Sequence, residues 1–157
     1  MPDDQDELIR QLFAAVVPEI ACGTVAIRAI ARIRGIHSRI AASSDDPQVD
    51  PVGVCTGQRV AASGPFAFDS SRISTIGDRL GGERLEIVRW SDTPQTMIAN
   101  ALVVAPECIQ DMILLHAEHR AVVTVKQDLV GLLEGRRGES LALASRLCGW
   151  DIDLRVQ

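Results

Sequence analysis

A short internal repeat constrains the fold of this chain more than any other feature. The segment Arg79-Leu80-x-Gly82-x-x-Leu85-Glu86-Ile87 matches the segment Arg146-Leu147-x-Gly149-x-x-Ile152-Asp153-Leu154 without a gap. In both copies a glycine stands where the end of a helix favours a left-handed cap, and the residues after it alternate as in a strand. The repeat therefore predicts that one supersecondary unit occurs twice.

Apolar periodicity extends this repeat to a unit of helix, two strands, two helices and a strand. In the first unit we predict helices over residues 6–17, 52–56 and 71–80 and strands over 24–33, 39–43 and 84–90. In the second unit we predict helices over residues 94–104, 128–134 and 139–147 and strands over 109–115, 121–126 and 151–156. Because Arg28 and Arg32 alternate with apolar residues, we expect one face of the first hairpin to be exposed to water. The predicted fold class is α+β, with αββααβ units over residues 1–91 and 92–157, each a three-stranded sheet packed against helices.

Length and composition fit this organisation. A chain of 157 residues, 46% of them hydrophobic, can form two small domains that lean on each other. No apolar run reaches the roughly 18 residues that cross a bilayer, and the start is acidic, so we expect a cytoplasmic protein without a membrane partner. The cysteines are far apart, with no C-x-x-C pair, and are predicted to be reduced and buried: Cys22, Cys55, Cys108 and Cys148.

Charge and aromatic content limit the kinds of nucleic-acid site. A net charge of -5 argues against coating nucleic acid by charge alone, since nonspecific affinity comes from Lys and Arg on phosphates. Aromatic residues make up 3% of the chain, too few for a platform that stacks successive bases. Any RNA site is therefore expected to be local and to contact the backbone.

The strongest local candidate is the segment Gly135-Arg136-Arg137-Gly138, between two predicted helices. The first glycine can end one helix, and the second can let a sugar-phosphate approach where a Cβ would obstruct it. The next helix points free N–H groups at the anion, and two arginines add positive charge. A G-x-x-G turn alone is weak evidence, because an ordinary helix–helix turn has the same letters.

Other polar clusters have simpler interpretations. Asp45, Asp46 and Asp50 are expected to cap the short helix that follows, with a divalent-ion site as the less favoured alternative. His116 and His119 are interpreted as exposed turn residues rather than a metal pair. We find no nucleophile elbow and no phosphate-binding G-x-x-x-x-G-K, so we expect neither an enzyme nor a cofactor.

Several motifs in register give the chain a family resemblance. They are Val17-Pro18-Glu19-Ile20, Asp46-Pro47-Gln48-Val49-Asp50-Pro51-Val52-Gly53, Ile98-Ala99-Asn100-Ala101-Leu102 and Ala144-Ser145-Arg146-Leu147-x-Gly149-Trp150-x-Ile152-Asp153. With the G-x-x-G turn, they resemble the paired type II KH domains of the NusA family. The resemblance implies a transcription elongation, termination or antitermination factor that binds single-stranded RNA. It implies RNA contacts at Gly135, Arg136, Arg137, Gly138, Glu139 and Ser140, and at Gly57, Gln58, Arg59, Ser71 and Arg72.

Two departures from the family pattern leave questions open. In the first unit, residues 60–70 separate Gly57-Gln58-Arg59 from Ser71-Arg72, so we expect the second unit to be the principal RNA site. Phe66 and Phe68 in that insertion are assigned to packing or partner contact rather than base stacking. The resemblance does not extend to the polymerase-binding and S1 domains of full-length bacterial NusA, so RNA polymerase and other transcription factors are only candidate partners. A KH-like protein-binding adaptor with degenerate RNA sites is the alternative.

Overall fold

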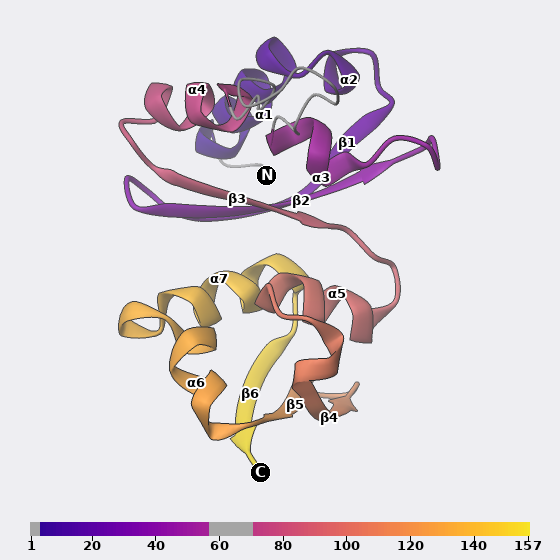
Figure 1. The fold of residues 1–157 in the computed structure, drawn as a ribbon, viewed down its shortest axis with the longest axis vertical. Coiled ribbons are helices and arrows are strands. Elements are labelled where there is room, and N and C mark those ends of the chain that lie inside the picture. Colours follow the sequence, from indigo (N-terminus) through magenta and orange to yellow (C-terminus); the bar gives the residue numbers. More distant parts are fainter. Residues whose placement is uncertain (1–3, 57–70) are drawn as a thin grey trace, which may run out of the picture.

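The computed structural model describes residues 4–56 and 71–157 and contains two similar units (Figure 1). The first unit comprises α1 (Asp4–Val16), α2 (Pro18–Ala21), β1 (Val25–Ile33), β2 (His37–Ser44), α3 (Pro51–Thr56), α4 (Ser71–Arg79) and β3 (Arg84–Arg89). The second comprises α5 (Pro94–Leu102), η2 (Pro106–Cys108), β4 (Ile109–Leu115), β5 (Arg120–Val125), α6 (Gln127–Glu134), η3 (Arg136–Gly138), α7 (Glu139–Cys148) and β6 (Asp151–Val156). The predicted α+β class and element order are confirmed, whereas α2 and the two 3-10 turns are additions that the periodicity did not predict.

Both sheets have the same topology, as the internal repeat predicts. In each sheet the second strand lies in the middle, antiparallel to the strand before it and parallel to the last strand of its unit. The repeated glycines Gly82 and Gly149 both have the left-handed backbone that the prediction required, with φ of 86° and 78°. The parallel pairing of β2 with β3 places His37 beside Arg84 and Arg39 beside Glu86.

Helices cover one face of the first sheet, at the top of Figure 1. The amphipathic face predicted for α1 is confirmed, since Ile9 and Phe13 are fully buried against Val25 of β1, Ile40 of β2 and Ile76 of α4. The start of α3 is capped as expected, because the Asp50 carboxylate accepts a hydrogen bond from the Val52 amide at 3.1 Å.

The prediction that the first hairpin has a water-exposed face was wrong. A register irregularity in β1 between Ile27 and Ala29 redirects the side chains that follow. Val25 and Ile27 pack under the helices of the first unit, whereas Ala29, Ala31 and Ile33 belong to the core of the second. Figure 1 shows α5 and α7 lying between the two sheets, where they cover this face.

The two units share a hydrophobic core across this contact. Small side chains of the first sheet, Ala31 and Ala41, form one cluster with Ile98 of α5 and with Leu143 and Leu147 of α7. Small residues at the centre of the sheet allow α7 to approach it closely. The helix α7, which begins directly after the candidate RNA turn, is therefore packed against both units.

The four cysteines are free thiols, but only one matches the predicted burial. Cys55 is fully buried, Cys108 and Cys148 are partly buried, and Cys22 is exposed. The prediction for Cys22 was wrong because this residue caps the end of the short helix α2, where it faces solvent. Among the described residues, no helix has the length and apolar character needed to span a membrane.

Candidate nucleic-acid interface

The Gly135-Arg136-Arg137-Gly138 segment forms a tight turn between α6 and α7, and we call it the GRRG turn. Gly135 ends α6 with φ 72° and ψ -177°, while Arg137 and Gly138 adopt left-handed conformations with φ of 56° and 72°. Both arginines are exposed. The turn therefore lies at the surface inside an αββααβ unit, as the sequence predicted.

The two glycines of the turn serve different purposes. A Cβ added at Gly135 would lie 2.7 Å from the Cβ of Ser140, so this glycine allows the backbone to pack tightly on the first turn of α7. A Cβ added at Gly138 would meet nothing within 4 Å. The space over Gly138 is open, and a phosphate can approach the backbone there.

The N-terminus of α7 faces this open space. Gly138 is its N-cap and supplies no side-chain cap, and the Glu139 amide bonds back to the carbonyl of Arg136. The next amides of a helix have no partner within the helix and carry partial positive charge. Together with the exposed side chains of Arg136 and Arg137, they give this end of α7 a positive charge suited to an anion, which the carboxylate of Glu139 partly cancels.

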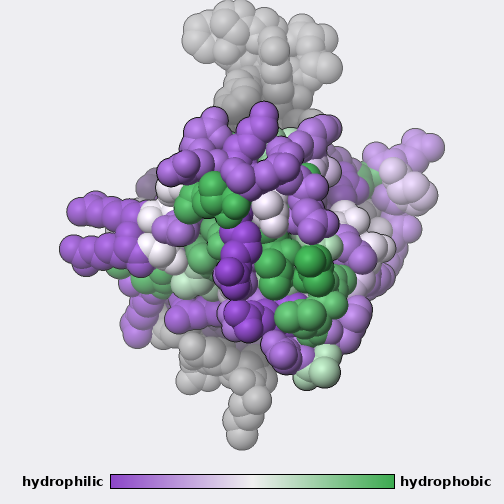
Figure 2. Space-filling view, turned by 90° about the horizontal axis from the view of Figure 1, so that it is seen from below, coloured by the Kyte–Doolittle hydropathy of each residue, from purple (hydrophilic) through white to green (hydrophobic). Residues whose placement is uncertain are grey.

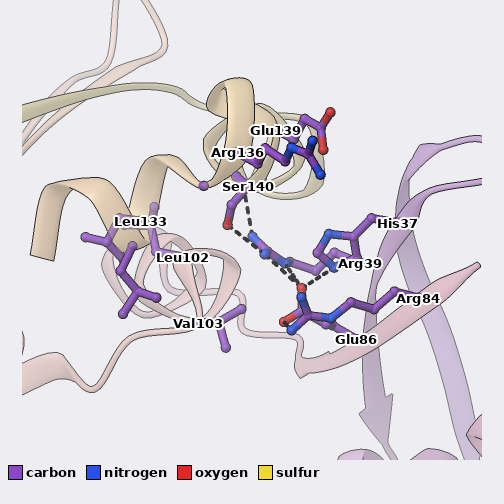
Figure 3. Close-up of a pocket in the computed structure, with 12 residues that line it drawn as sticks. His37, Arg39, Arg84, Glu86, Leu102, Val103, Leu133, Arg136, Glu139 and Ser140 are labelled. Atoms are coloured by element: carbon purple, nitrogen blue, oxygen red, sulfur yellow. Dashed lines mark hydrogen bonds and ion pairs between the residues drawn. The ribbon is translucent and has the colours of Figure 1, made fainter.

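A pocket of about 300 Å³ opens beside the turn, between the two units (Figure 3). The pocket is lined by charged and polar side chains on one side and by apolar side chains on the other. The polar lining residues are His37, Arg39, Arg84, Glu86, Arg136, Glu139 and Ser140, and the apolar ones are Leu102, Val103, Leu132 and Leu133, with Gly135 between the helices. We call this the interunit pocket. It uses residues of both β2–β3 and α5–α7, so neither unit forms it alone.

Arg39 fixes one wall of the interunit pocket. This residue is only 2% exposed. Its guanidinium donates to Glu86 Oε1 at 2.9 and 3.1 Å, to the Ala101 carbonyl at 2.7 Å, and to the carbonyl and hydroxyl of Ser140 at 3.1 and 2.9 Å. Because Gly135 packs on Ser140, a side chain of the first unit holds the base of the GRRG turn in place.

The carboxylate of Glu86 stays charged in this environment. Desolvation alone would raise its pKa, but the hydrogen bond and charge of Arg39, followed by those of His37, hold the pKa below its ordinary value. The His37 ring contacts the same oxygen, Oε1, that receives Arg39. The other oxygen, Oε2, lies 3.8 Å from the guanidinium of Arg84.

Residues 3–90 match the family model of the NusA-like first KH domain. This chain belongs to the NusA-like KH family. It is 38% identical over 150 residues to the transcription termination/antitermination protein NusA of Bacillus subtilis, covering 96% of this chain and 37% of that protein. It is 37% identical over 147 residues to the NusA of Thermus thermophilus, covering 94% of this chain and 35% of that protein. The chain thus spans little more than a third of these relatives.

A solved structure supports the same fold over both NusA-like KH units. The crystal structure of APE1850 superposes with a TM-score of 0.58 at 16% identity, covering 95% of each chain. At that identity the likeness concerns the fold alone. The tandem KH fold expected from the sequence agrees with the family match over residues 3–90 and with the two three-stranded sheets of identical topology.

In the first KH unit, the structure places Arg72 in contacts within the protein. Its guanidinium donates to the Val54 carbonyl at 2.7 Å and to the Glu19 carboxylate at 3.2 Å, which ties α4 to α3 and α2. Ser71 begins α4. The other residues predicted here, Gly57, Gln58 and Arg59, and the two phenylalanines Phe66 and Phe68, lie outside the described residues.

The histidines of the second KH unit contact a tryptophan. His116 and His119 are both exposed, as predicted. The His119 ring stacks on Trp150 with centroids 4.3 Å apart, and the His116 ring meets it edge-on at 5.4 Å. They therefore cover the buried indole beside the β4–β5 turn.

Proposed function

We propose that this chain binds single-stranded RNA mainly through the GRRG turn of its second KH unit, as a transcription elongation, termination or antitermination factor. The observation that carries the proposal is the open space over Gly138 at the uncapped start of α7, flanked by two exposed arginines. KH modules clamp about four nucleotides with such a turn. The proposed contacts are Gly135, Arg136, Arg137, Gly138, Glu139 and Ser140, with Gly57, Gln58, Arg59, Ser71 and Arg72 as a subordinate site.

The transcriptional role is taken over from the relatives that the chain resembles. Those proteins are transcription termination/antitermination proteins. RNA polymerase and other transcription factors are proposed partners on this basis. The chain's own contribution would be binding and not catalysis, since backbone clamping requires no reactive group.

A pair of matched glycine variants tests the RNA site. Gly138 and Gly149 lie at opposite ends of α7, both with left-handed φ, and a Cβ at either would meet nothing within 4 Å. Gly138→Asp and Gly149→Asp should therefore carry a similar backbone penalty of about 1 kcal/mol. Only Gly138→Asp places an anion where the phosphate is expected, so only this variant should lose most of its affinity for single-stranded RNA.

The measurement is a titration of both variants at fixed salt, because phosphate contacts make affinity depend strongly on ionic strength. Unfolding of each variant by urea checks that the fold is retained. If Gly138→Asp binds RNA as tightly as the parent, the GRRG turn is not the site.

A protein-binding adaptor is the second candidate function, and one surface favours it. Ile113 and Leu115 are 49% and 37% exposed on β4, and Val122 of β5 lies opposite Ile113. Figure 2 shows hydrophobic side chains gathered on the end of the molecule formed by the second unit, with hydrophilic ones around them. An Ile113→Lys variant should keep RNA binding and lose a protein partner if this candidate holds.

A further inference from the structure

We propose that the interunit pocket receives one base of the bound RNA strand, next to the phosphate held by the GRRG turn. The base is expected to carry an exocyclic amino group, as adenine does. This inference deepens the proposed function and rests on it. In this arrangement, residues of both KH units contribute to the RNA site.

The turn and the pocket are continuous. Gly135, Arg136, Glu139 and Ser140 belong to the turn or the first residues of α7, and all four also line the pocket. A strand whose phosphate lies at Gly138 therefore passes the mouth of the pocket. A neighbouring nucleotide can turn its base inward without leaving the protein surface.

The apolar wall is suited to the flat face of a base. Leu132 of α6 is 73% exposed and Val103 is 52% exposed, although both are apolar. Val103 also adopts a left-handed backbone, with φ 56° and ψ 49°, which is rare for a β-branched residue. Strained and exposed apolar residues at the rim of a cavity are typical of ligand sites.

The polar wall supplies charge for the phosphate and an acceptor for the base edge. Arg84 is largely exposed and reaches the pocket from β3, and Arg136 reaches it from the turn. Glu86 gives one oxygen to Arg39 and His37, while Oε2 is 3.8 Å from Arg84. That oxygen can accept a hydrogen bond from an exocyclic amino group.

The pocket is already formed before RNA arrives. Arg39 holds Glu86 on one side and Ser140 on the other, so the polar wall does not need to be ordered on binding. Preorganisation of this kind lowers the cost of association. The site therefore has a shape that a single nucleotide can select.

The experiment uses the full chain and a matched set of variants. Arg84→Ala and Leu132→Ala alter the pocket, while Arg89→Ala removes an exposed arginine at the other end of the same strand, where it pairs with Asp50. Each is titrated with a strand of about four nucleotides, the length clamped by a KH turn, and with an adenine-rich strand about twice as long. Scanning the longer strand with 2-aminopurine identifies the base whose fluorescence changes on binding.

The proposal predicts that Arg84→Ala and Leu132→Ala weaken binding of the longer strand by about tenfold, as expected for one lost contact. Arg89→Ala should bind both strands like the parent. The fluorescence change at one position should be lost in Leu132→Ala. Replacing adenine there by purine, which lacks only the amino group, should also weaken binding by about tenfold.

Two results would overturn this assignment. One is that Arg84→Ala and Leu132→Ala bind the longer strand like the parent. The other is that Arg89→Ala loses as much affinity as those two variants, which would mean that affinity depends on total positive charge and not on the pocket. In either case, loss of binding in Gly138→Asp would leave the proposed function standing, so the two failures are distinguishable.

Discussion

Replacing Arg39 by methionine should destabilise the whole molecule and not just one unit. The buried guanidinium makes five hydrogen bonds, which connect Glu86 on β3 with Ala101 on α5 and Ser140 on α7. Methionine has similar bulk but removes the guanidinium from the partly buried Glu86 carboxylate, which keeps only its hydrogen bond with His37, and it leaves two carbonyls without this donor. Breaking a buried ion pair by removing one partner costs about 3–5 kcal/mol. For a chain of this size that corresponds to a fall in Tm of about 10 °C.

The assay is urea and thermal unfolding followed by far-ultraviolet circular dichroism and calorimetry. Arg84→Ala is the control, because Arg84 approaches the same carboxylate at 3.8 Å but is largely exposed, and its loss should cost under about 1 kcal/mol. The parent should unfold in one transition, since the units share a core. If Arg39→Met is no less stable than Arg84→Ala, or if the parent units melt independently, the reasoning is wrong.

Three further predictions concern single residues. The pKa of Glu86 in the folded protein is lowered from its ordinary 4.5, so the contribution of Glu86 to stability is present above pH 4.5 and is lost as the pH falls through the lowered pKa. The variant Glu86→Gln should flatten this acid dependence of the unfolding free energy in urea titrations. Hydrogen bonds from Thr24 lower the pKa of the exposed Cys22 thiol, whereas burial raises the pKa of the Cys55 thiol to about 12. Iodoacetamide should therefore modify Cys22 first and Cys55 only after unfolding, and mass spectrometry of digests would show this order. Gly135→Ala should cost about 2–4 kcal/mol in chemical unfolding, because a Cβ would crowd Ser140 at positive φ.

Much of the fold could be predicted because its signals are local. The helices and strands follow from apolar spacing, and Gly82 and Gly149 mark the ends of the repeated helices through a backbone that other residues rarely adopt. The GRRG turn was found in the same way, since glycines and charges at fixed spacing in a helix–helix turn are visible in the letters.

The faces of the first sheet were not predictable from alternation alone. The irregularity between Ile27 and Ala29 shifts the pattern by one residue, and an alternating sequence does not show where such a shift falls. The apolar residues after it are small, like Ala29 and Ala31, which indicates a close neighbour. Only the position of α7 shows that the neighbour is the other unit.

The interunit pocket was missed for a related reason. His37 and Arg39 are two residues apart, as are Arg84 and Glu86, so each pair lies on one face of a strand. Bringing these pairs together requires the parallel register of β2 with β3, and reaching Ser140 requires the packing of α7 on the first sheet. These contacts join residues as many as 101 positions apart, and no local pattern in the sequence encodes them.

The most direct test of RNA binding by the GRRG turn is an amide chemical-shift map of the labelled chain during titration with single-stranded RNA. The largest chemical-shift changes are expected at Gly138, Glu139 and Ser140, and the next largest at the residues that line the interunit pocket. Shifts confined to the exposed face of β4 and β5, with the GRRG turn unchanged, would contradict RNA binding at this turn.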